Sequence, residues 1–258
     1  MKKSNDANIP VNKFTVIVLG DSGVGKTSII NWLIHNQFSN YISSTIGVDF
    51  NIYEKGVIRK SQEVYDITSP SRLLDDCPPK TKQSDLVHIK CYIYDTAGQE
   101  MYKSIIQTYY KKADVCIFVF DLTDKNTLNS VAEWYNDFTQ YNTSATKYLV
   151  GNKTDLLVEN PELTKLSNFI KYEPIDDDYV KMVLNAHDFQ NEHVICISAS
   201  TGFNVKHFFE NHLIKDLAKH VYSDPLRGKS KDKYIKLLDD SNGHKHHHHS
   251  RNMCCTVL

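Results

Sequence analysis

Several features are absent from this 258-residue sequence, and each absence excludes a class of protein. No apolar run reaches the roughly 18 residues that a membrane-spanning helix needs, so we expect no transmembrane helix. The first residues, MKKSND, contain no apolar core, which argues against a signal peptide. The 30 basic and 31 acidic side chains leave a net charge of −1, so the charge balance gives no reason to expect nucleic-acid binding.

The cysteines do not have the spacing of a disulfide framework. Four of them are scattered along the chain: Cys77, Cys91, Cys116 and Cys196. Three of these fall in expected strands, so we interpret the four as small buried hydrophobes or loop residues in a reducing compartment. The other two, Cys254 and Cys255, are adjacent and are considered below. Apolar residues make up 41% of the chain, enough for the core of one large domain or two small ones.

Short apolar runs alternate along the chain with segments that have helical spacing. The strand-like runs lie at residues 14–19, 91–94, 115–120, 148–150 and 194–197. Helical spacing follows the first run and recurs at residues 128–138 and 205–217. This alternation predicts an α/β fold with a mostly parallel sheet covered on both faces, whose ligands bind at the carboxyl ends of the strands.

Two stretches interrupt this pattern. Residues 56–87 are polar and contain several prolines, which predicts a long loop between two strands. The segment 156–192 is longer than an ordinary connection. Its acidic residues 176–178 are typical of the first turn of a helix. We therefore expect an N-terminal extension at 1–11, one folded domain at 12–222 and a flexible tail at 223–258. The tail includes the histidine run 246–249, interpreted as a low-complexity spacer in preference to a metal site.

Residues 20–27 read GDSGVGKT and directly follow the first apolar run. This is the strand, glycine-rich loop and helix start of a P-loop, G-x-x-x-x-G-K-[ST]. The glycines let the backbone curl so that several N–H groups point at a phosphate near a helix N-terminus. Lys26 adds a positive charge for the β- and γ-phosphates, and the hydroxyl of Thr27 is a ligand for Mg²⁺.

Three further motifs each follow an expected strand. Residues 95–99 read DTAGQ, and Asp95 is placed to hold the water shell of Mg²⁺, as an acidic Walker-B residue does. Residues 152–155 read NKTD, and the carboxylate of Asp155 can accept hydrogen bonds from N1–H and N2–H₂ of guanine. Adenine lacks this pair of donors, and such a site discriminates by about 10⁴–10⁵-fold. Residues 198–200 read SAS and offer a backbone N–H to the guanine oxygen.

These motifs, in this order, resemble those of the Ras superfamily of small GTPases. Further sequences resemble the Rab branch: TIGVDF at 45–50, DTAGQE at 95–100, Ser-Ile at 104–105, Tyr-Tyr at 109–110, FDLT at 120–123 and the paired cysteines. The resemblance covers residues 12–222 apart from the two interruptions. It implies a P-loop NTPase small G domain with a six-stranded, mostly parallel sheet and helices on both faces. In this fold the loop at 56–87 joins the second and third strands and points away from the nucleotide.

The resemblance also implies a GTP/GDP site with Mg²⁺ and assigns residues to it. The phosphates are wrapped by Ser22, Gly23, Val24, Gly25, Lys26, Thr27 and Ser28, and contacted by the backbone N–H of Gly98. Mg²⁺ is held by Thr27, Thr45 and, through water, Asp95. The guanine base is contacted by Phe38, Asn152, Lys153, Asp155, Ser198, Ala199 and Ser200. Rab proteins usually carry lysine where Ser200 stands.

Catalysis and partners follow from the same resemblance. Gln99 is the catalytic residue that orients the attacking water. Residues 28–45 contain no Arg or Lys, so a GTPase-activating protein is expected to supply the transition-state arginine. The effector surface is formed by Ile46, Phe50, Tyr94 and Tyr109. The other implied partners are effectors, a guanine-nucleotide exchange factor, a GDP-dissociation inhibitor and a prenylation escort protein.

The sequence ends in CCTVL, which fits a C-a-a-X prenylation signal. One lipid gives only marginal anchoring, so we expect geranylgeranyl groups on both Cys254 and Cys255, with one prenyl group and palmitate on Cys254 as the alternative. The expected location is the cytoplasmic face of a Golgi, endosomal or vesicle membrane, in exchange with the cytosol.

Taken together, the sequence predicts a Rab-like GTP/GDP switch that hydrolyses GTP and recruits effectors in vesicle trafficking. Two alternatives stay open: a GTP-binding scaffold with little hydrolysis, and a member of the Ras superfamily outside the Rab branch. A metabolic P-loop kinase or ATPase is a third, and the guanine-reading Asp155 argues against it.

Overall fold

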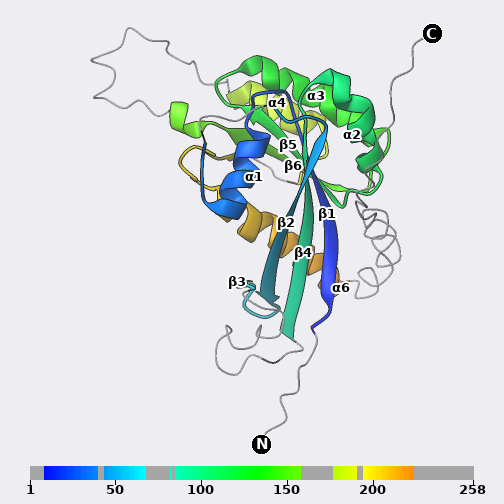
Figure 1. The fold of residues 1–258 in the computed structure, drawn as a ribbon, viewed down its shortest axis with the longest axis vertical. Coiled ribbons are helices and arrows are strands. Elements are labelled where there is room, and N and C mark those ends of the chain that lie inside the picture. Colours follow the sequence, from blue (N-terminus) through cyan, green and yellow to red (C-terminus); the bar gives the residue numbers. More distant parts are fainter. Residues whose placement is uncertain are drawn as a thin grey trace, which may run out of the picture.

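The computed structural model describes residues 9–39, 44–67, 82, 85–157, 177–190 and 194–223. A seven-stranded sheet with the order β3-β2-β4-β1-β5-β6-β7 runs through this part of the chain (Figure 1). The strands are β1 (Val11–Leu19), β2 (Val48–Ile58), β3 (Val64–Asp66), β4 (Leu86–Thr96), β5 (Val115–Asp121), β6 (Thr146–Asn152) and β7 (Ile195–Cys196). The α/β class is therefore confirmed, with one short strand more than expected.

The helices lie between the strands in the expected alternation. The α-helices are α1 (Lys26–His35), α2 (Lys103–Tyr110), α3 (Lys125–Thr139), α4 (Asp177–Ala186), α5 (Val205–His207) and α6 (Lys215–Ser223). Three shorter segments are the 3₁₀ turns η2 (Glu100–Tyr102) and η3 (Thr154–Leu156) and the π-helical η4 (Phe208–Ile214). The helix expected after the acidic residues 176–178 is α4. None of the described helices combines the length and the apolar character required to span a bilayer.

The pairing of the strands is mostly parallel. Strand β1 lies between β4 and β5 and pairs in parallel with both, and β6 and β7 continue the parallel set. Only β2 is antiparallel, both to β4 and to β3. Because parallel strands need crossover connections, the helices cover both faces of the sheet, and every residue of β5 is buried.

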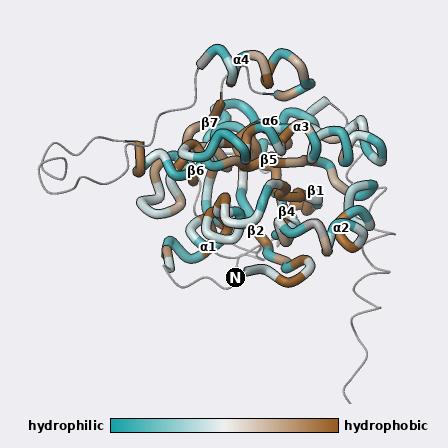
Figure 2. Tube along the Cα trace, turned by 90° about the horizontal axis from the view of Figure 1, so that it is seen from above, coloured by the Kyte–Doolittle hydropathy of each residue, from teal (hydrophilic) through white to brown (hydrophobic). Residues whose placement is uncertain are grey.

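Strand β1 shows how the sequence builds a core on each face. Val16 and Val18 point into a cluster with α1 and with the helical stretch from α5 to α6. Ile17 and Leu19 point the other way, into a cluster with α2, α3 and α4. This alternation is the two-residue period of a strand, and it makes the apolar run at 14–19 a doubly covered strand. In Figure 2 hydrophobic segments of β1, β4 and β5 lie near the middle of the molecule.

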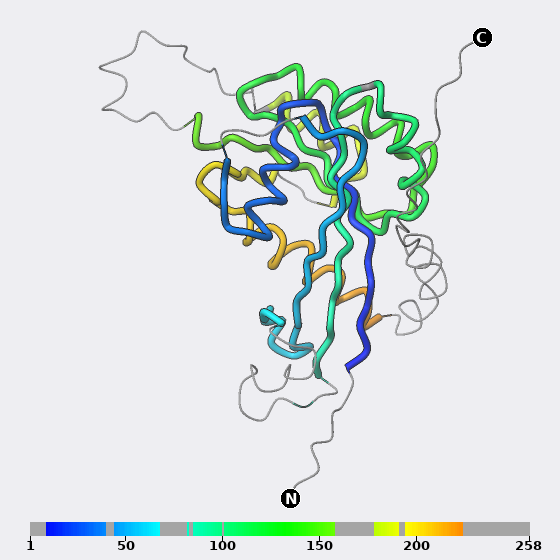
Figure 3. The backbone as a smooth tube through the Cα atoms, in the orientation of Figure 1, coloured from blue at the N-terminus to red at the C-terminus, as the bar shows by residue number. Residues whose placement is uncertain are grey.

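The prediction that all of residues 56–87 form a loop is wrong at both ends. Strand β2 continues to Ile58, β4 begins at Leu86, and β3 pairs with β2 from Val57↔Val64 to Lys55↔Asp66. The hairpin end lies opposite the nucleotide motifs, as expected (Figure 3). Residues 68–81 and 83–84 lie outside the described residues.

A buried lysine joins this extra strand to β2 and η4. Lys55 on β2 is ion-paired with Asp66 on β3 and, at 2.7 Å, with Oε1 of Glu210 on η4. The hydroxyl of Tyr53 donates to the same Glu210 oxygen at 3.2 Å. A buried ammonium needs such partners, so the acidic side chain of β3 is a structural ligand and not a loop residue.

Several expectations fall on residues that the structure does not describe. They concern most of the N-terminal extension, residues 158–176 of the second interruption, and the tail with its histidine run, Cys254 and Cys255. The division of the chain into 1–11, 12–222 and 223–258 therefore stays a prediction. Of the scattered cysteines in the described part, Cys91 and Cys116 are buried free thiols, as expected, and Cys196 is partly buried.

Candidate functional site

The loop between β1 and α1 has a backbone that only glycine can adopt at two places. Gly20 has φ 144°, and a Cβ there would lie 2.1 Å from the carbonyl oxygen of Val119 on β5. Gly25 has φ 96°, and a Cβ there would lie 2.3 Å from Nδ2 of Asn152. The loop is thus pressed against the carboxyl ends of β5 and β6, and its N–H groups lead into the N-terminus of α1.

Lys26, the first residue of α1, is buried inside this loop. Its Nζ donates hydrogen bonds to the carbonyl oxygens of Gly20 and Asp21, both at 2.7 Å. Burial lowers the pKa of Lys26 to about 8, although the charges of Asp95 and Asp21 oppose that shift. A phosphate beside this ammonium would stabilise the charged form of Lys26, which burial disfavours. Binding a phosphate is the role expected of Lys26.

Three oxygen-bearing residues that are far apart in the sequence meet beside Lys26. The hydroxyl of Thr27 donates to Oδ2 of Asp95 at 2.6 Å and lies 2.8 Å from the hydroxyl of Thr45. The other carboxylate oxygen of Asp95 is buried and has no hydrogen-bond partner in the described part of the chain. Burial raises the pKa of Asp95 to about 6, which the hydrogen bond from Thr27 partly opposes.

The oxygen cluster fits a hard divalent cation. Hydroxyl and carboxylate oxygens are the ligands that Mg²⁺ prefers, and the unpartnered oxygen of Asp95 is the group that a cation or its bound water would satisfy. The described residues hold no group of three or more His, Cys, Asp or Glu side chains suited to a metal. A cation here would therefore complete its shell with water and phosphate oxygens, as Mg²⁺ commonly does.

A cavity of about 380 Å³ opens next to the loop, within the usual range for small-molecule sites. It is lined by Gly23, Gly25, Ser28, Phe38, Ser39, Asn152, Lys153, Asp155, Leu156, Ala199 and Ser200. All but two of these were expected from the sequence. Ser39 and Leu156 were missed, and each directly follows an expected residue or motif, which is the only signal that the sequence offers for them.

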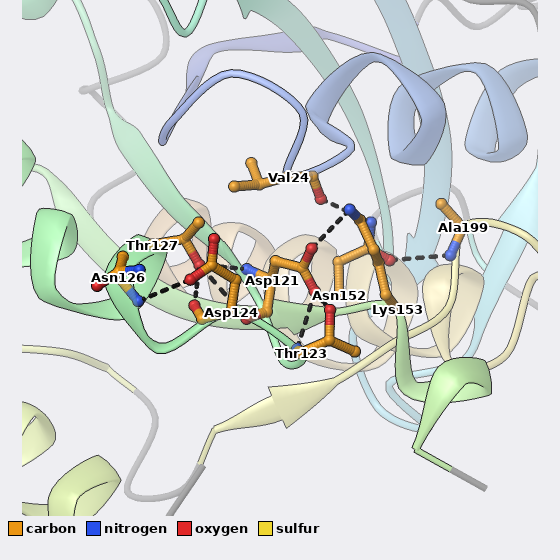
Figure 4. A network of polar contacts seen from close by, with 9 residues as sticks. All are labelled: Val24, Asp121, Thr123, Asp124, Asn126, Thr127, Asn152, Lys153 and Ala199. Atoms are coloured by element: carbon orange, nitrogen blue, oxygen red, sulfur yellow. Dashed lines mark hydrogen bonds and ion pairs between the residues drawn. The ribbon is translucent and has the colours of Figure 1, made fainter. Parts of the chain in front are cut away.

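Asn152 connects three parts of the site (Figure 4). Its Nδ2 donates to the carbonyl oxygen of Val24 at 2.9 Å, and its Oδ1 accepts from the backbone N–H of Ala199 at 3.0 Å. Both ends of the buried amide are therefore engaged within the protein. Asn152 aligns the phosphate loop with the loop after β7, and direct contact of Asn152 or of the Ala199 N–H with a base stays a prediction.

Asp155 lines the cavity and is oriented by Ser198. The hydroxyl of Ser198, which is almost fully buried, donates to Oδ1 of Asp155 at 2.6 Å. The hydroxyl of Ser198 thus fixes the direction of the Asp155 carboxylate, and contact of Ser198 or Asp155 with a base stays a prediction. A short hydrogen bond to a charged oxygen restricts the carboxylate strongly, which suits it for bidentate recognition.

The DTAGQ segment lies against the phosphate loop. A Cβ at Gly98 would lie 2.3 Å from the carbonyl carbon of Asp21 and from the backbone nitrogen of Ser22, so only glycine allows this contact. The carbonyl oxygen of Gln99 accepts from the N–H of Tyr102 at 3.1 Å, which begins the turn into α2. The segment is thus fixed against Asp21 and Ser22 of the phosphate loop, and the contact of Gly98 with a γ-phosphate and the role of the Gln99 side chain stay predictions.

The expected aromatic surface is present. The ring of Tyr94 lies 5.5 Å from that of Phe50 and 4.7 Å from that of Tyr109, measured between centroids. Tyr92 was missed and stacks on Phe50 at 5.6 Å, a position that its two-residue spacing from Tyr94 indicates. Ile46, which precedes β2, is 79% exposed, and its place on an effector surface stays a prediction.

The phosphate loop, the cation-compatible oxygens and the cavity all lie at the carboxyl ends of parallel strands, which makes this chain a P-loop protein of the α/β class. The model of the Ras family matches residues 15–219, and the chain belongs to that family.

Three relatives indicate which branch of the Ras family this chain resembles. Ras-related protein Rab-1 of Theileria annulata is 38% identical over 146 residues, which are 56% of this chain and 54% of the relative. Ras-related protein Rab-1 of Theileria parva is 38% identical over 145 residues, or 55% and 54%. GTP-binding protein YPTM2 of Zea mays is 34% identical over 144 residues, or 55% and 58%. The chain spans just over half the length of these relatives, and the expected resemblance to Rab proteins is confirmed.

Proposed function

We propose that this chain is a Rab-like small GTPase that alternates between GTP and GDP and recruits effectors in intracellular vesicle trafficking. The observation that carries the proposal is the position of Asp155, a guanine-reading carboxylate in a cavity that continues into the phosphate loop. The family of the chain and its Rab-1 and YPTM2 relatives support the same activity.

The site residues divide the work of holding the nucleotide. Lys26 and the N–H groups of the loop bind the phosphates, and Asn152 keeps that loop in register with the base pocket. Thr27, Thr45 and Asp95 hold Mg²⁺, which neutralises charge on the phosphate oxygens. Loss of the γ-phosphate removes a contact of Thr45 and of the Gly98 N–H, so the segments that contain them relax in the GDP state.

Hydrolysis requires a partner. Gln99 orients the attacking water, but residues 28–45 supply no Arg or Lys to stabilise the transition state. A GTPase-activating protein therefore supplies an arginine. In Ras itself such a partner raises the rate by about 10⁵-fold, equivalent to roughly 7 kcal/mol of barrier.

A calorimetric titration tests the proposed ligand. In the presence of Mg²⁺ we expect GDP to bind tightly and ADP to bind at least about 10⁴-fold more weakly, because adenine leaves the Asp155 carboxylate without its donors. Removal of Mg²⁺ by a chelator is expected to weaken GDP binding. Equal affinity for GDP and ADP would support a P-loop kinase or ATPase and contradict the proposal.

The proposed partners meet different parts of the molecule. Effectors bind the surface formed by Ile46, Phe50, Tyr94 and Tyr109, of which Ile46 and Phe50 are exposed. An exchange factor and a GDP-dissociation inhibitor act on the segments around Thr45 and Gly98. A prenylation escort protein presents Cys254 and Cys255 for geranylgeranylation. The lipids place the protein on the cytoplasmic face of an intracellular membrane, of the Golgi, endosomes or vesicles, from which it returns to the cytosol.

Replacing both Cys254 and Cys255 with serine tests the anchoring. We expect the double variant to remain in the supernatant when membranes are sedimented from cells, because it cannot be prenylated. The two single variants separate one lipid from two, since one chain gives only marginal and reversible binding. Sedimentation of the double variant with membranes would contradict anchoring at these cysteines.

A further inference from the structure

The FDLT sequence at residues 120–123 resembles that of Rab proteins, but the proposed function gives it no role. Asp121, its acidic member, is the last residue of β5 and pairs in the sheet with Asn152, the last residue of β6. This register places the side chain of Asp121 beside Lys153, which follows Asn152 in the NKTD motif. Oδ2 of Asp121 forms an ion pair with Nζ of Lys153 at 2.6 Å.

The carboxylate of Asp121 is held in place from its own side of the site (Figure 4). Its Oδ1 accepts hydrogen bonds from the backbone N–H of Thr123 at 2.9 Å and from the hydroxyl of Thr123 at 2.7 Å. The backbone N–H of Asp121 donates to the hydroxyl of Thr127, on the first turn of α3, at 2.9 Å. The side chain of Asp121 is only 10% exposed, so the acceptor that faces Lys153 has a fixed direction.

Lys153 needs such a partner. Its side chain is 32% exposed, it lines the cavity, and its backbone is left-handed with φ 69° and ψ 33°. A lysine stem has four rotatable carbons and is flexible unless its ammonium is bound. With the ammonium bound to Asp121, the stem has both ends fixed, and its methylene groups form a constant part of the cavity lining.

We infer that Asp121 is a positioning residue of the nucleotide pocket: it holds the ammonium of Lys153 so that the lysine stem forms a rigid wall against the purine ring and slows nucleotide release. This inference rests on the proposed function, because it requires a purine nucleotide in the cavity. It assigns the FDLT sequence a role in the lifetime of the nucleotide complex.

A double-mutant cycle on the full chain tests this role. The rate of release of N-methylanthraniloyl-GDP is measured by dilution into excess GDP for the unmodified chain, Asp121→Asn, Lys153→Met and the double variant. We expect Asp121→Asn to speed release by about five- to tenfold, as for loss of one charge-assisted hydrogen bond. In the Lys153→Met background, where no ammonium remains to be held, the same change is expected to have less than about a twofold effect.

Asp124→Asn is the matched control. Asp124 lies three residues from Asp121, and its Oδ1 accepts from the N–H of Asn126 as the N-cap of α3, a role that asparagine also fills. The control removes the same charge from the same turn and is expected to leave the release rate unchanged.

Two results would overturn the inference. One is a release rate of Asp121→Asn equal to that of the unmodified chain, and the other is an equal acceleration in the Lys153→Met background, which would indicate a general structural effect. If Asp121→Asn does not fold, Thr123→Val removes one hydrogen bond that orients the carboxylate and is expected to speed release about two- to threefold only when Lys153 is present. Absence of that acceleration would also contradict the inference. Failure of the unmodified chain to bind the probe would instead contradict the proposed function, and this inference with it.

Discussion

Replacing Asp155 with asparagine is expected to lower the affinity for GTP by about a thousandfold or more and to create affinity for XTP. The carboxylate of Asp155 lines the cavity and is oriented by the hydroxyl of Ser198 at 2.6 Å. In the variant the amide N–H₂ of asparagine faces the N1–H and N2–H₂ groups of guanine. All of these are hydrogen-bond donors, so they are buried without acceptors. Xanthine has a carbonyl oxygen at C2 that can accept from the amide.

Competition titrations with GTP and XTP measure the relative affinity of Asp155→Asn for the two nucleotides. Asp178→Asn on α4 is a suitable control because it removes an exposed carboxylate that does not line the cavity. Ser198→Ala adds a second comparison. It leaves the charge of Asp155 in place but removes the hydrogen bond that orients the carboxylate. We expect it to lower the affinity for GTP without raising the affinity for XTP. An Asp155→Asn variant that keeps its full preference for GTP would remove Asp155 from base recognition.

Replacing Gln99 with leucine is expected to slow stimulated GTP hydrolysis by about a hundredfold or more, with GTP affinity retained. Gln99 follows Gly98, whose Cα lies against the backbone of the phosphate loop, so its side chain starts beside the place of the γ-phosphate. Leucine has a similar size but cannot hydrogen-bond the attacking water. The lost rate therefore reflects the positioning of water and not the binding of nucleotide.

Single-turnover hydrolysis, with and without an activating protein, measures the effect of Gln99→Leu. Gln107→Leu is a matched control, since Gln107 lies on α2 and donates to Asp137 on α3 at 2.8 Å, outside the cavity lining. Unchanged turnover of Gln99→Leu would exclude Gln99 from the mechanism. A stimulated rate in the unmodified chain that is no higher than the intrinsic rate would favour the GTP-binding scaffold.

The parts of the site that were predictable are those whose chemistry is local. The left-handed glycines of the phosphate loop, Lys26 and the NKTD residues lie in continuous motifs. Gly23, Gly25, Asn152, Lys153 and Asp155 line one cavity, and Lys26 is buried within the adjoining loop. The motifs themselves indicated that Thr27 and Asp95 share one cation site, whereas the approach of Thr45 to them is a long-range contact that only the resemblance to a family indicated.

The parts that were not predictable depend on partners distant in the sequence. Nothing local to Asn152 shows that its amide is shared between Val24 and Ala199, or that Ser198 is bound to Asp155. The loop expected at 56–87 was wrong at its ends, where the buried residues Val57, Ile58, Leu86 and Val87 extend β2 and β4. Nothing local indicates the pairing of Asp66 on β3 with Lys55, which is also bound to Glu210, more than a hundred residues later.

The hairpin formed by β2 and β4 is stiff along its whole length. Each strand has 11 residues, and they pair without interruption from Val48↔Thr96 to Ile58↔Leu86, a ladder about 35 Å long. One end carries Asp95 beside the phosphate loop, and the far end is braced by Lys55 against η4. We expect small movements at the nucleotide end to leave the far end of this continuously paired ladder in place. A protein bound at the far tip would therefore gain the same binding energy with GTP or GDP, so the tip suits permanent attachment and not the sensing of nucleotide.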